Sequence, residues 1–330
     1  MTEGYVSVIV VNWNGKEHLG PCLSSLLTQT YPSYEVVLVD NGSTDGSIAY
    51  VQERFPQVKV IANGTNIGFA GGNNVAIKVT SGEYVATVNN DTVAHPRWLD
   101  ELMRVAQSEP SVGMVASKIL FHHQRDVIDS AGIAVDKAGI GWNLRHGERD
   151  NGQSEEPAEV FGACAAAALY RRAMLNEVGL FDEDFFAYYE DVDLAWRARL
   201  RGWTCLYNPR AIVYHVHSAT GGEGPSKNRL LGRNKVWTIV KNYPSPHVLL
   251  FLPLILLYDW AAIWYTLSRG DVSALEGRLA ALRLLPKMLR KRTEIQKKRI
   301  PWAVFPLSTP PSPLVALSRH RRSQVFRRAH

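Results

Sequence analysis

Apolar runs alternate with amphipathic segments along the first 120 residues. The runs predict strands over 5–13, 35–43, 58–63, 84–88 and 112–120. Between them, leucine and valine spacing and the positions of Thr, Asp and Pro predict helices over 16–28, 44–55, 68–80 and 96–108. Continuous apolar strands separated by helices are typical of a parallel sheet covered on both faces. We therefore expect an α/β fold with such a sheet.

The pattern changes after residue 120. Residues 121–160 are rich in glycine and charged residues and poorly periodic, so we expect loops beside a binding cleft. Small residues dominate 161–170, a short helix ends at Gly179, and 188–203 has the single apolar stripe of a well-packed helix. One or two strands are expected over 204–218.

A strongly apolar segment follows at 247–267, close to the length of about 20 residues that spans a bilayer. Pro253, Asp259 and a cluster of Trp and Tyr argue against a simple span, because these aromatic residues favour the headgroup level. Leucines then recur among Arg and Lys at helical spacing, at Leu279, Leu282, Leu285 and Leu289. An apolar helix followed by a basic amphipathic helix predicts attachment to an anionic membrane surface. A buried core helix and a dimer interface are the alternatives.

Charge supports this interpretation. The net charge is +6, yet residues 278–330 hold 14 Lys and Arg and one acid, so residues 1–277 carry a net −7. A basic tail on an acidic body favours a polyanionic partner. No recognition helix or nucleic-acid motif accompanies the tail, so DNA is not predicted. The three cysteines are far apart, which supports neither a disulfide framework nor a zinc site, and Met1–Gly4 lacks the basic region of a signal peptide.

Three predicted strands end in small polar residues, where ligands bind in an open α/β sheet. The sets are Asn12-Trp13-Asn14, Asp40-Asn41-Gly42-Ser43 and Asn89-Asn90-Asp91-Thr92. One such end is typical of turns and helix caps, but three together favour a site. Asp40 is suited to accept the ring N–H of a pyrimidine. Asp91, with amide oxygens and a diphosphate, offers the hard oxygen ligands that Mg²⁺ or Mn²⁺ prefers.

A general base is expected in the acidic segment 182–193, which contains six acids. Glu190 and Asp191 begin the predicted helix beside Tyr188 and Tyr189. Aromatic neighbours and clustered like charges raise the pKa of a carboxyl group toward that of a usable base. The remaining acids are expected to be solvated or to favour the helix N-terminus.

Taken together, these stretches resemble glycosyltransferase family 2, and within it the rhamnosyltransferase-like branch. The resemblance covers about residues 5–245 and is carried by VSVIVVNWNG, LSSLLTQTYPSYEVVLVDNGSTDGS, NIGFAGGNN, GEYVATVNNDTVAHPRWL, GLFDEDFFAYYEDVDLAWRARLRGW and AIVYHVHS. It implies a GT-A type, Rossmann-like fold with a mostly parallel sheet. It also implies a nucleotide-sugar donor, a divalent metal (Mg²⁺ or Mn²⁺) and inversion at the anomeric carbon.

The resemblance assigns roles residue by residue. Asp40 matches the base-binding aspartate, Asp91 the last acid of the metal-binding Asp-x-Asp, and Asp191 the catalytic base, with Glu190 orienting the acceptor. Asn89 replaces the first acid of that motif, as is usual in the rhamnosyltransferase-like branch. His215 matches a metal-ligating histidine of some relatives, although a strand-end histidine is also compatible with a purely structural role. The expected nucleotide-sugar contacts are Asn12, Asn14, Asp40, Asn41, Asn66, Gly68, Asn73, Asn89, Asn90 and Arg233.

These assignments define a domain scheme. We expect a catalytic domain over 1–245, with a nucleotide-sugar-binding half over 1–120 and an acceptor-binding half over 121–245. Within the second half, the Gly-rich stretch 218–235 is expected to be a mobile lid that brings Arg233 to the diphosphate, with an ordinary solvated loop as the alternative. A helical membrane-associating region over 246–300 and a flexible basic tail over 301–330 follow.

The expected activity is transfer of a sugar to a lipid-linked or cell-envelope glycan at the cytoplasmic face of a bacterial plasma membrane. The preferred donor is dTDP-rhamnose, and a UDP-linked galactofuranose or another hexose is the alternative. An inactive nucleotide-sugar-binding scaffold is the alternative of another class, which Asn89 favours and the intact Glu190-Asp191 pair opposes. A nucleotidyltransferase would need a basic, Gly-rich phosphate loop after the first strand, and NWNGKEH matches this poorly.

Overall fold

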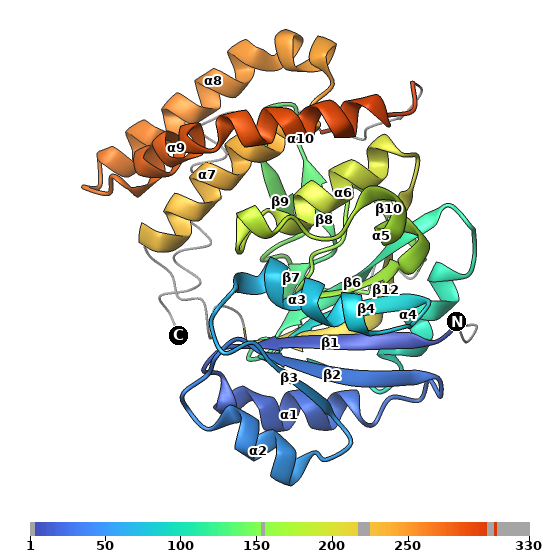
Figure 1. Cartoon of the computed structure of the whole chain (residues 1–330). Coiled ribbons are helices and arrows are strands. Elements are labelled where there is room, and N and C mark those ends of the chain that lie inside the picture. The colour runs from blue at the N-terminus through green and yellow to red at the C-terminus, as the bar shows by residue number, and fades with distance from the viewer. Residues whose placement is uncertain (1–3, 153–155, 217–224, 302–306, 309–330) are drawn as a thin grey trace.

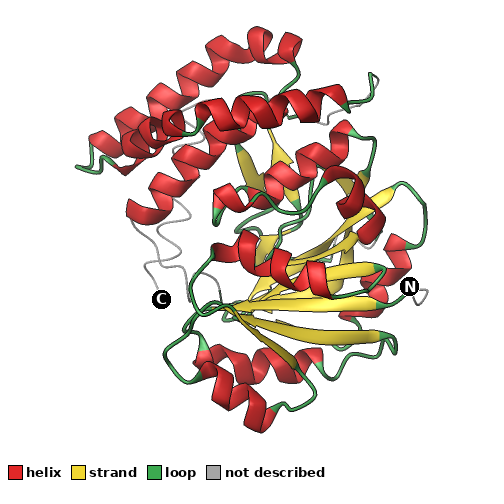
Figure 2. Cartoon of the chain, viewed as in Figure 1, coloured by secondary structure: helices red, strands yellow, loops and turns green. Residues whose placement is uncertain are grey.

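In the computed structural model, residues 4–152, 156–216, 225–301 and 307–308 are described. The chain forms a ten-stranded sheet flanked by helices, with further helices stacked above one of its faces (Figures 1 and 2). The strands are β1 (Val6–Asn12), β2 (Tyr34–Asp40), β3 (Lys59–Ala62), β4 (Tyr84–Asn89), β5 (Thr92–Ala94), β6 (Val112–Phe121), β7 (Ile128–Ser130), β8 (Ile133–Val135), β9 (Gly141–Asn143), β10 (Ala158–Val160), β11 (Ala167–Arg171) and β12 (Thr204–His215).

Ten helices and one 3₁₀ turn lie in these described ranges. They are α1 (Lys16–Leu26), α2 (Ser47–Arg54), α3 (Gly68–Val79), α4 (Trp98–Ala106), α5 (Arg172–Val178), the 3₁₀ turn η1 (Glu183–Phe185), α6 (Glu190–Leu200), α7 (Pro225–Asn242), α8 (Ser245–Leu267), α9 (Ser273–Arg283) and α10 (Leu285–Lys297). The five strands and four helices predicted in the first 120 residues are confirmed, as are the short helix ended by Gly179, which has φ +85°, and the long helix that follows it.

The sheet runs in the order β10-β12-β6-β11-β4-β1-β2-β3, with β5 paired to β12 and β7 to β6. Strands β1 to β4 are parallel, as are β6 and β12, and apolar residues fill both faces. One core cluster joins the sheet to α1, α2 and α4, and the other joins its opposite face to α3, α5 and α6. The expected GT-A-like arrangement, a mostly parallel sheet covered on both faces, is therefore confirmed.

One strand departs from the parallel pattern. β11 lies between β4 and β6 and is antiparallel to both. Its beginning therefore lies at the edge of the sheet where β4 and β6 end. This orientation brings the residues just before β11 to the same edge as the polar strand ends.

The segment 121–160 is not simply loops, as the sequence predicted. It contains β7, β8, β9 and β10, each only three residues long. Three residues are too few to show a period of two, so their pairing is set by tertiary contacts. β8 and β9 form a separate two-stranded sheet.

Four helices, α7 to α10, follow β12 and lie above α6 (Figure 1). In the expected lid 218–235, residues from Pro225 onward belong to the helix α7, whereas 217–224 lie outside the described residues. α8 is long and apolar enough to cross a membrane, and only 11% of its most apolar 18-residue stretch is buried. It is therefore not the buried core helix that the sequence left open. Of the expected basic tail, 302–306 and 309–330 lie outside the described residues.

Candidate active site at the strand ends

Three strand ends meet at one edge of the sheet. β1 pairs with both β2 and β4, and the register places Asn12 opposite Asp40 and Val11 opposite Asn89. The buried Asn12 amide joins the three ends: its Nδ2 donates to Asp40 Oδ2 at 2.9 Å, and its Oδ1 accepts from Asn90 Nδ2 at 2.7 Å. The sequence prediction that these residues share one location is consistent with this geometry.

Asp40 is fully buried at the end of β2. Besides the bond from Asn12, its Oδ1 accepts the backbone N–H of Ser43 at 2.8 Å. These two bonds hold the carboxylate and the following turn in place. Each oxygen retains one further lone pair for an additional donor.

The neighbouring amides hold the loops that follow β1, β2 and β3. Asn14, at φ +50°, accepts the N–H of Thr44 through its side chain. Asn41 Nδ2 donates to the carbonyl of Gly68 at 3.0 Å, and Asn66 Oδ1 accepts the N–H of the same glycine. Gly68, at φ +77°, starts α3 at this edge.

Asn73 lies inside α3 and is fully buried. Its Nδ2 donates to the carbonyl of Phe69 at 2.9 Å, whereas its Oδ1 has no hydrogen-bond partner within the described part of the chain. This unsatisfied acceptor is the kind of group that a bound donor can satisfy.

A chain of charged side chains lies just beyond β4. His215 Nε2 is 3.2 Å from Asp91 Oδ1 and 3.3 Å from Asn89 Nδ2, and His215 Nδ1 is 2.7 Å from Asp129 Oδ2. Asp91, Asp129 and His215 are buried, and His146 contacts Asp129 from the other side at 3.1 Å. β12 supplies the histidine and β7 supplies Asp129, so the sheet brings together residues that are far apart in the sequence.

The electrostatics of this cluster favour the protonated form of His215 beside the Asp91 carboxylate. Burial alone would lower the pKa of His215, but its hydrogen bonds to Asp129 and Asp91 outweigh burial and raise that pKa to about 10. Burial would raise the pKa of Asp91, but the bond and charge of His215 lower it below the ordinary value. A positive charge therefore already lies beside the Asp91 carboxylate in the form of the imidazolium.

These residues also fit a divalent metal. A metal would have to displace the proton on His215 Nε2; the neutral ring would then donate Nδ1–H to Asp129 and present Nε2 toward Asp91 as a ligand. Within the described ranges, no group of three or more His, Cys, Asp or Glu side chains could hold a metal ion without further ligands. Mg²⁺ in nucleotide enzymes commonly has one or two protein ligands and completes its shell with phosphates and water.

The expected base lies at the first turn of α6. Asp191 Oδ1 accepts the N–H of Val192 at 2.8 Å, and Oδ2 accepts the N–H of Ala165 at 3.2 Å. Burial raises the pKa of Asp191 against these backbone bonds. Burial and the charge of Asp191 raise the pKa of the buried Glu190 well above its ordinary value, so Glu190 remains neutral when Asp191 is ionised.

The segment before β11 links the base to the strand ends. Ala165 donates to Asp191, and the next residue, Ala166, accepts the N–H of Asn89 at 2.9 Å. Cys164 lies close enough to Asp191 and Asp129 that, after burial, their charges raise its pKa above the ordinary value. The base and the Asp91 cluster therefore border the same short segment.

Comparisons with known proteins show the family of this chain. Residues 7–179 match the family model described as glycosyl transferase family 2. The chain belongs to glycosyltransferase family 2. Its relatives include O-antigen biosynthesis protein RfbC of Myxococcus xanthus, 32% identical over 65% of this chain and 17% of that protein. They also include N-acetylglucosaminyl-diphospho-decaprenol L-rhamnosyltransferase of Mycobacterium tuberculosis, 29% identical over 67% of this chain and 79% of that protein.

Solved structures show the same fold at lower identity. The mannosyltransferase PcManGT of Pyrobaculum calidifontis, in complex with GDP-Man and Mn²⁺, is 21% identical with a TM-score of 0.53 over 88% of this chain and 84% of that one. GalNAc-T7 with UDP, GalNAc and Mn²⁺ is 17% identical with a TM-score of 0.63 over 92% and 58%. The GT-A-like fold of this glycosyltransferase is thus shared with enzymes whose structures contain Mn²⁺.

Two findings differ from the sequence-based picture of the glycosyltransferase site. Asp129, which orients His215, was missed because it lies in the segment interpreted as loops and belongs to no recognisable motif. Arg233 lies on α7, where it donates to the carbonyls of Asp184 and Phe185 and stacks 4.3 Å from the Trp237 ring. This position favours a structural role for Arg233 over the expected diphosphate contact on a lid.

Proposed function

We propose that this glycosyltransferase is an inverting enzyme that transfers a sugar, preferably L-rhamnose from dTDP-rhamnose, to a hydroxyl of a lipid-linked or cell-envelope glycan. The observation that carries the proposal is the Asp91–His215–Asp129 cluster, which borders the segment that also binds Asp191. Rhamnosyl transfer to a decaprenol-linked acceptor is named for the mycobacterial relative. On this basis we propose a rhamnose donor and a lipid-linked acceptor for this chain as well.

Asp191 acts as the base of the proposed reaction. It takes the proton from the acceptor hydroxyl while that oxygen attacks the anomeric carbon, and the bond from this carbon to the diphosphate breaks on the opposite face. The raised pKa of Asp191 makes it a stronger base than an ordinary aspartate. Glu190, neutral beside it, can hydrogen-bond the acceptor without competing for the proton.

Asp91 and His215 would hold a divalent cation, Mg²⁺ or Mn²⁺, which when bound neutralises charge on the departing diphosphate. Asp129 holds the His215 ring in orientation. Asn12 and Asp40 keep the β1 and β2 ends in register. We assign the remaining acceptor capacity of Asp40 to the ring N–H of a uracil or thymine base.

A donor panel tests this proposal. Thermal unfolding is measured with dTDP-rhamnose, UDP-galactofuranose, UDP-GlcNAc and GDP-mannose, each with and without Mn²⁺. A ligand at 100 times its Kd stabilises the folded state by about 2.7 kcal/mol, so the true donor raises Tm and the others do not. Asp191→Asn should keep this stabilisation and lose transfer. Near-normal transfer by that variant would show that Asp191 is not the base.

We also propose that α8 lies along the membrane surface rather than across the membrane. Its inner face is fixed to the protein, because Asp259 pairs with Lys235 of α7 at 3.1 Å and Arg278 of α9 at 2.6 Å. Its outer face carries an apolar stripe that includes Leu249, Leu250, Leu256, Leu257, Trp260, Trp264 and Leu267, all exposed. A helix held on one side and apolar on the other is suited to lie in the headgroup region.

The neighbouring helices add charge complementary to anionic lipid. α9 and α10 expose Leu279, Leu282 and Leu289 together with Arg283 and Arg290. Each such cation near an anionic leaflet contributes about 1 kcal/mol. This arrangement supports the cytoplasmic face of a bacterial plasma membrane as the location, beside a lipid-linked acceptor.

Vesicle sedimentation tests the attachment. The protein should sediment with vesicles containing phosphatidylglycerol more than with phosphatidylcholine vesicles, and a variant with both Leu257 and Trp260 changed to Gln should remain in solution. Val79→Gln is the matched control, since Val79 is 70% exposed on α3 of the catalytic domain. Equal sedimentation of the double variant and the control would exclude α8 as the attachment surface.

A further inference from the structure

The loop that leads into the Glu190-Asp191 pair has a costly conformation. Phe186, Tyr188 and Tyr189 have φ values of 66°, 67° and 69°, in a region that residues other than glycine rarely adopt. Each such residue costs about 1–3 kcal/mol and persists only where the surrounding structure enforces it. Tyr189 directly precedes α6, so this loop determines where the first turn of α6 presents Asp191.

One side chain of α7 binds most of this loop. Asn234 is fully buried, and its Nδ2 lies 3.0 Å from Phe185 O, 2.9 Å from Ala187 O and 2.7 Å from Tyr188 O. Arg233 Nε donates to Asn234 Oδ1 at 2.9 Å, which orients the amide with its donor side toward the loop.

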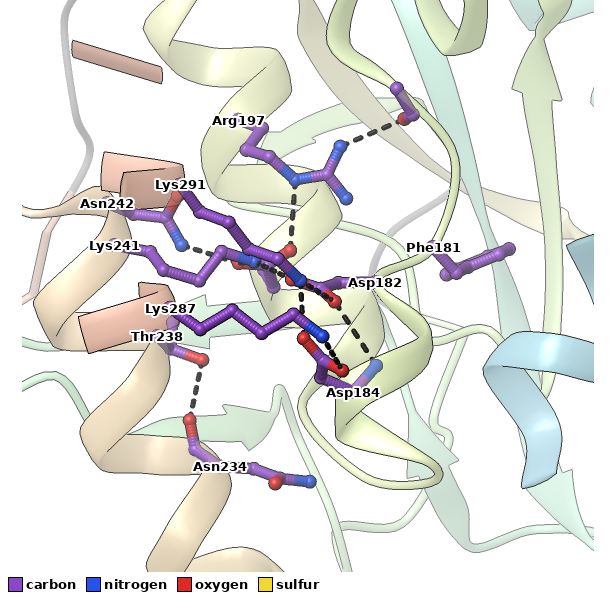
Figure 3. Close-up of polar contacts among 12 residues, drawn as sticks. Phe181, Asp182, Asp184, Arg197, Asn234, Thr238, Lys241, Asn242, Lys287 and Lys291 are labelled. Atoms are coloured by element: carbon purple, nitrogen blue, oxygen red, sulfur yellow. Dashed lines mark hydrogen bonds and ion pairs between the residues drawn. The ribbon is translucent and has the colours of Figure 1, made fainter. Parts of the chain in front are cut away.

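Arg233 and its neighbours hold the Asn234 side chain and the loop in place. Its Nη2 donates to Phe185 O at 2.8 Å, and its guanidinium stacks on Trp237, whose Nε1 donates to Ala281 O of α9. One turn further along α7, Lys241 pairs with Asp182, on the chain segment just before the loop (Figure 3).

Additional ion pairs join the same segment to α10. Lys291 lies 2.5 Å from Asp182 and 2.7 Å from Asp184, and Lys287 lies 2.6 Å from Asp184 (Figure 3). The segment that precedes the loop is thus held by side chains from both α7 and α10.

The opposite side of the loop touches the nucleotide half of the enzyme. The backbone N–H of Ala70, in the first turn of α3, donates to Phe186 O at 3.2 Å. A Cβ on Gly68 would lie 2.4 Å from that same oxygen, so the contact requires glycine there. The loop therefore lies between α3, at the strand-end site, and α7.

We propose that Asn234, supported by Arg233, is a positioning residue that sets the loop 185–189 and through it the location of Asp191. On this view α7 belongs to the active site, and the C-terminal helices do more than attach the protein. The inference rests on the proposed function, because it acts through Asp191 as the base. A displacement of about 1 Å at a reacting group can cost about 100-fold in rate.

The test compares two buried side chains on α7. Asn234→Ala removes the three contacts to the loop. Thr238→Val is the matched control, because Thr238 is also fully buried and its hydroxyl donates at 2.9 Å to the backbone carbonyl of residue 234 without touching the loop. Arg233→Met removes the second set of loop contacts and keeps the variant series informative if Asn234→Ala does not fold.

Asn234→Ala should lower kcat by about 10- to 100-fold while the KM and Kd for donor change less than about 3-fold. Arg233→Met should act in the same direction, by about 3- to 10-fold. Thr238→Val, which loses one hydrogen bond within α7, should leave kcat within about 2-fold. Normal kcat in the folded Asn234 or Arg233 variant, or a parallel loss in both Asn234→Ala and Thr238→Val, would overturn the inference.

Asp191→Asn in the same assay separates the inference from the function on which it rests. An inactive Asp191→Asn beside a fully active Asn234→Ala refutes the positioning role alone. An active Asp191→Asn refutes both, because the base itself would then be elsewhere.

Discussion

Asp129 gives a sharp test of the strand-end cluster, because its side chain touches His215 but not the proposed reacting atoms. Asp129→Asn keeps the size of the side chain and removes its charge. Asp129 is 2% exposed, and its 2.7 Å bond to His215 Nδ1 is a short, charge-assisted one. Hydrogen bonds to charged groups contribute about 1.5–3 kcal/mol to stability.

The consequence for metal is larger than the loss of one bond. Asn keeps an acceptor oxygen but loses the charge, so the bond from His215 Nδ1–H weakens and the ring is held less firmly with Nε2 toward Asp91. Loss of such supporting residues typically changes metal affinity by 10- to 100-fold. We therefore expect the Kd for Mn²⁺ in the presence of nucleoside diphosphate to rise by about that factor.

Free Mn²⁺ is measured by electron paramagnetic resonance during titration with UDP or dTDP present, which needs no turnover. Asp136→Asn serves as the control, since Asp136 is also a buried aspartate but accepts the backbone N–H groups of Ala138 and Ile140. Unchanged Mn²⁺ affinity in Asp129→Asn, or an equal loss in the control, would refute the assignment of Asp129 as the residue that orients His215.

Two further predictions concern the base and the loop. Burial raises the pKa values of Glu190 and Asp191, so the folded state holds protons that the unfolded state loses above pH 4.5, and stability falls as pH rises from there. Glu190→Gln should therefore raise Tm at pH 7–8 and lose this advantage below about pH 4. In the pH profile of kcat, the apparent pKa on the acidic side, which we assign to Asp191, should stay above the ordinary pKa of an aspartate. A gain in Tm that is equal at both pH values would contradict a buried, neutral Glu190. Gly68→Ala should destabilise by about 2 kcal/mol or more, measured by urea unfolding, because the new Cβ would meet Phe186 O. Gly147→Ala is the control, because Gly147 has the same φ of +77° but open space around it. An equal loss of stability in both variants would show that the backbone conformation, and not the contact with Phe186 O, causes the loss.

The sequence predicted most of the first half of the fold because its strands are long apolar runs and its helices have clear stripes. It also predicted that Asn12, Asp40 and Asp91 lie at one edge of the sheet, because parallel strands all end at the same edge and these residues stand at or just after strand ends. The sequence did not predict β7 to β10, because each has only three residues and so shows no alternation of apolar and polar positions.

The missed parts of the site have the same origin. The position of Asp129 is set by the pairing of β7 with β6, and this pairing depends on tertiary contacts that the local sequence does not reveal. Asn234 lies in a stretch whose glycines suggested a loop, yet the residues from 225 onward are helical because tertiary contacts with α9, α6 and α10 outweigh local preference.

The reversed direction of β11 determines which part of the chain lies beside Asp191. The chain arrives at the site through a run of small residues, and a Cβ on Gly162 would already meet the Cβ of Ala195 at 2.5 Å. Ala165 offers its N–H to Asp191 from the same run, so backbone rather than side chain contacts the base. Enlarging a residue there would crowd the backbone that contacts Asp191 without replacing Asp191 itself.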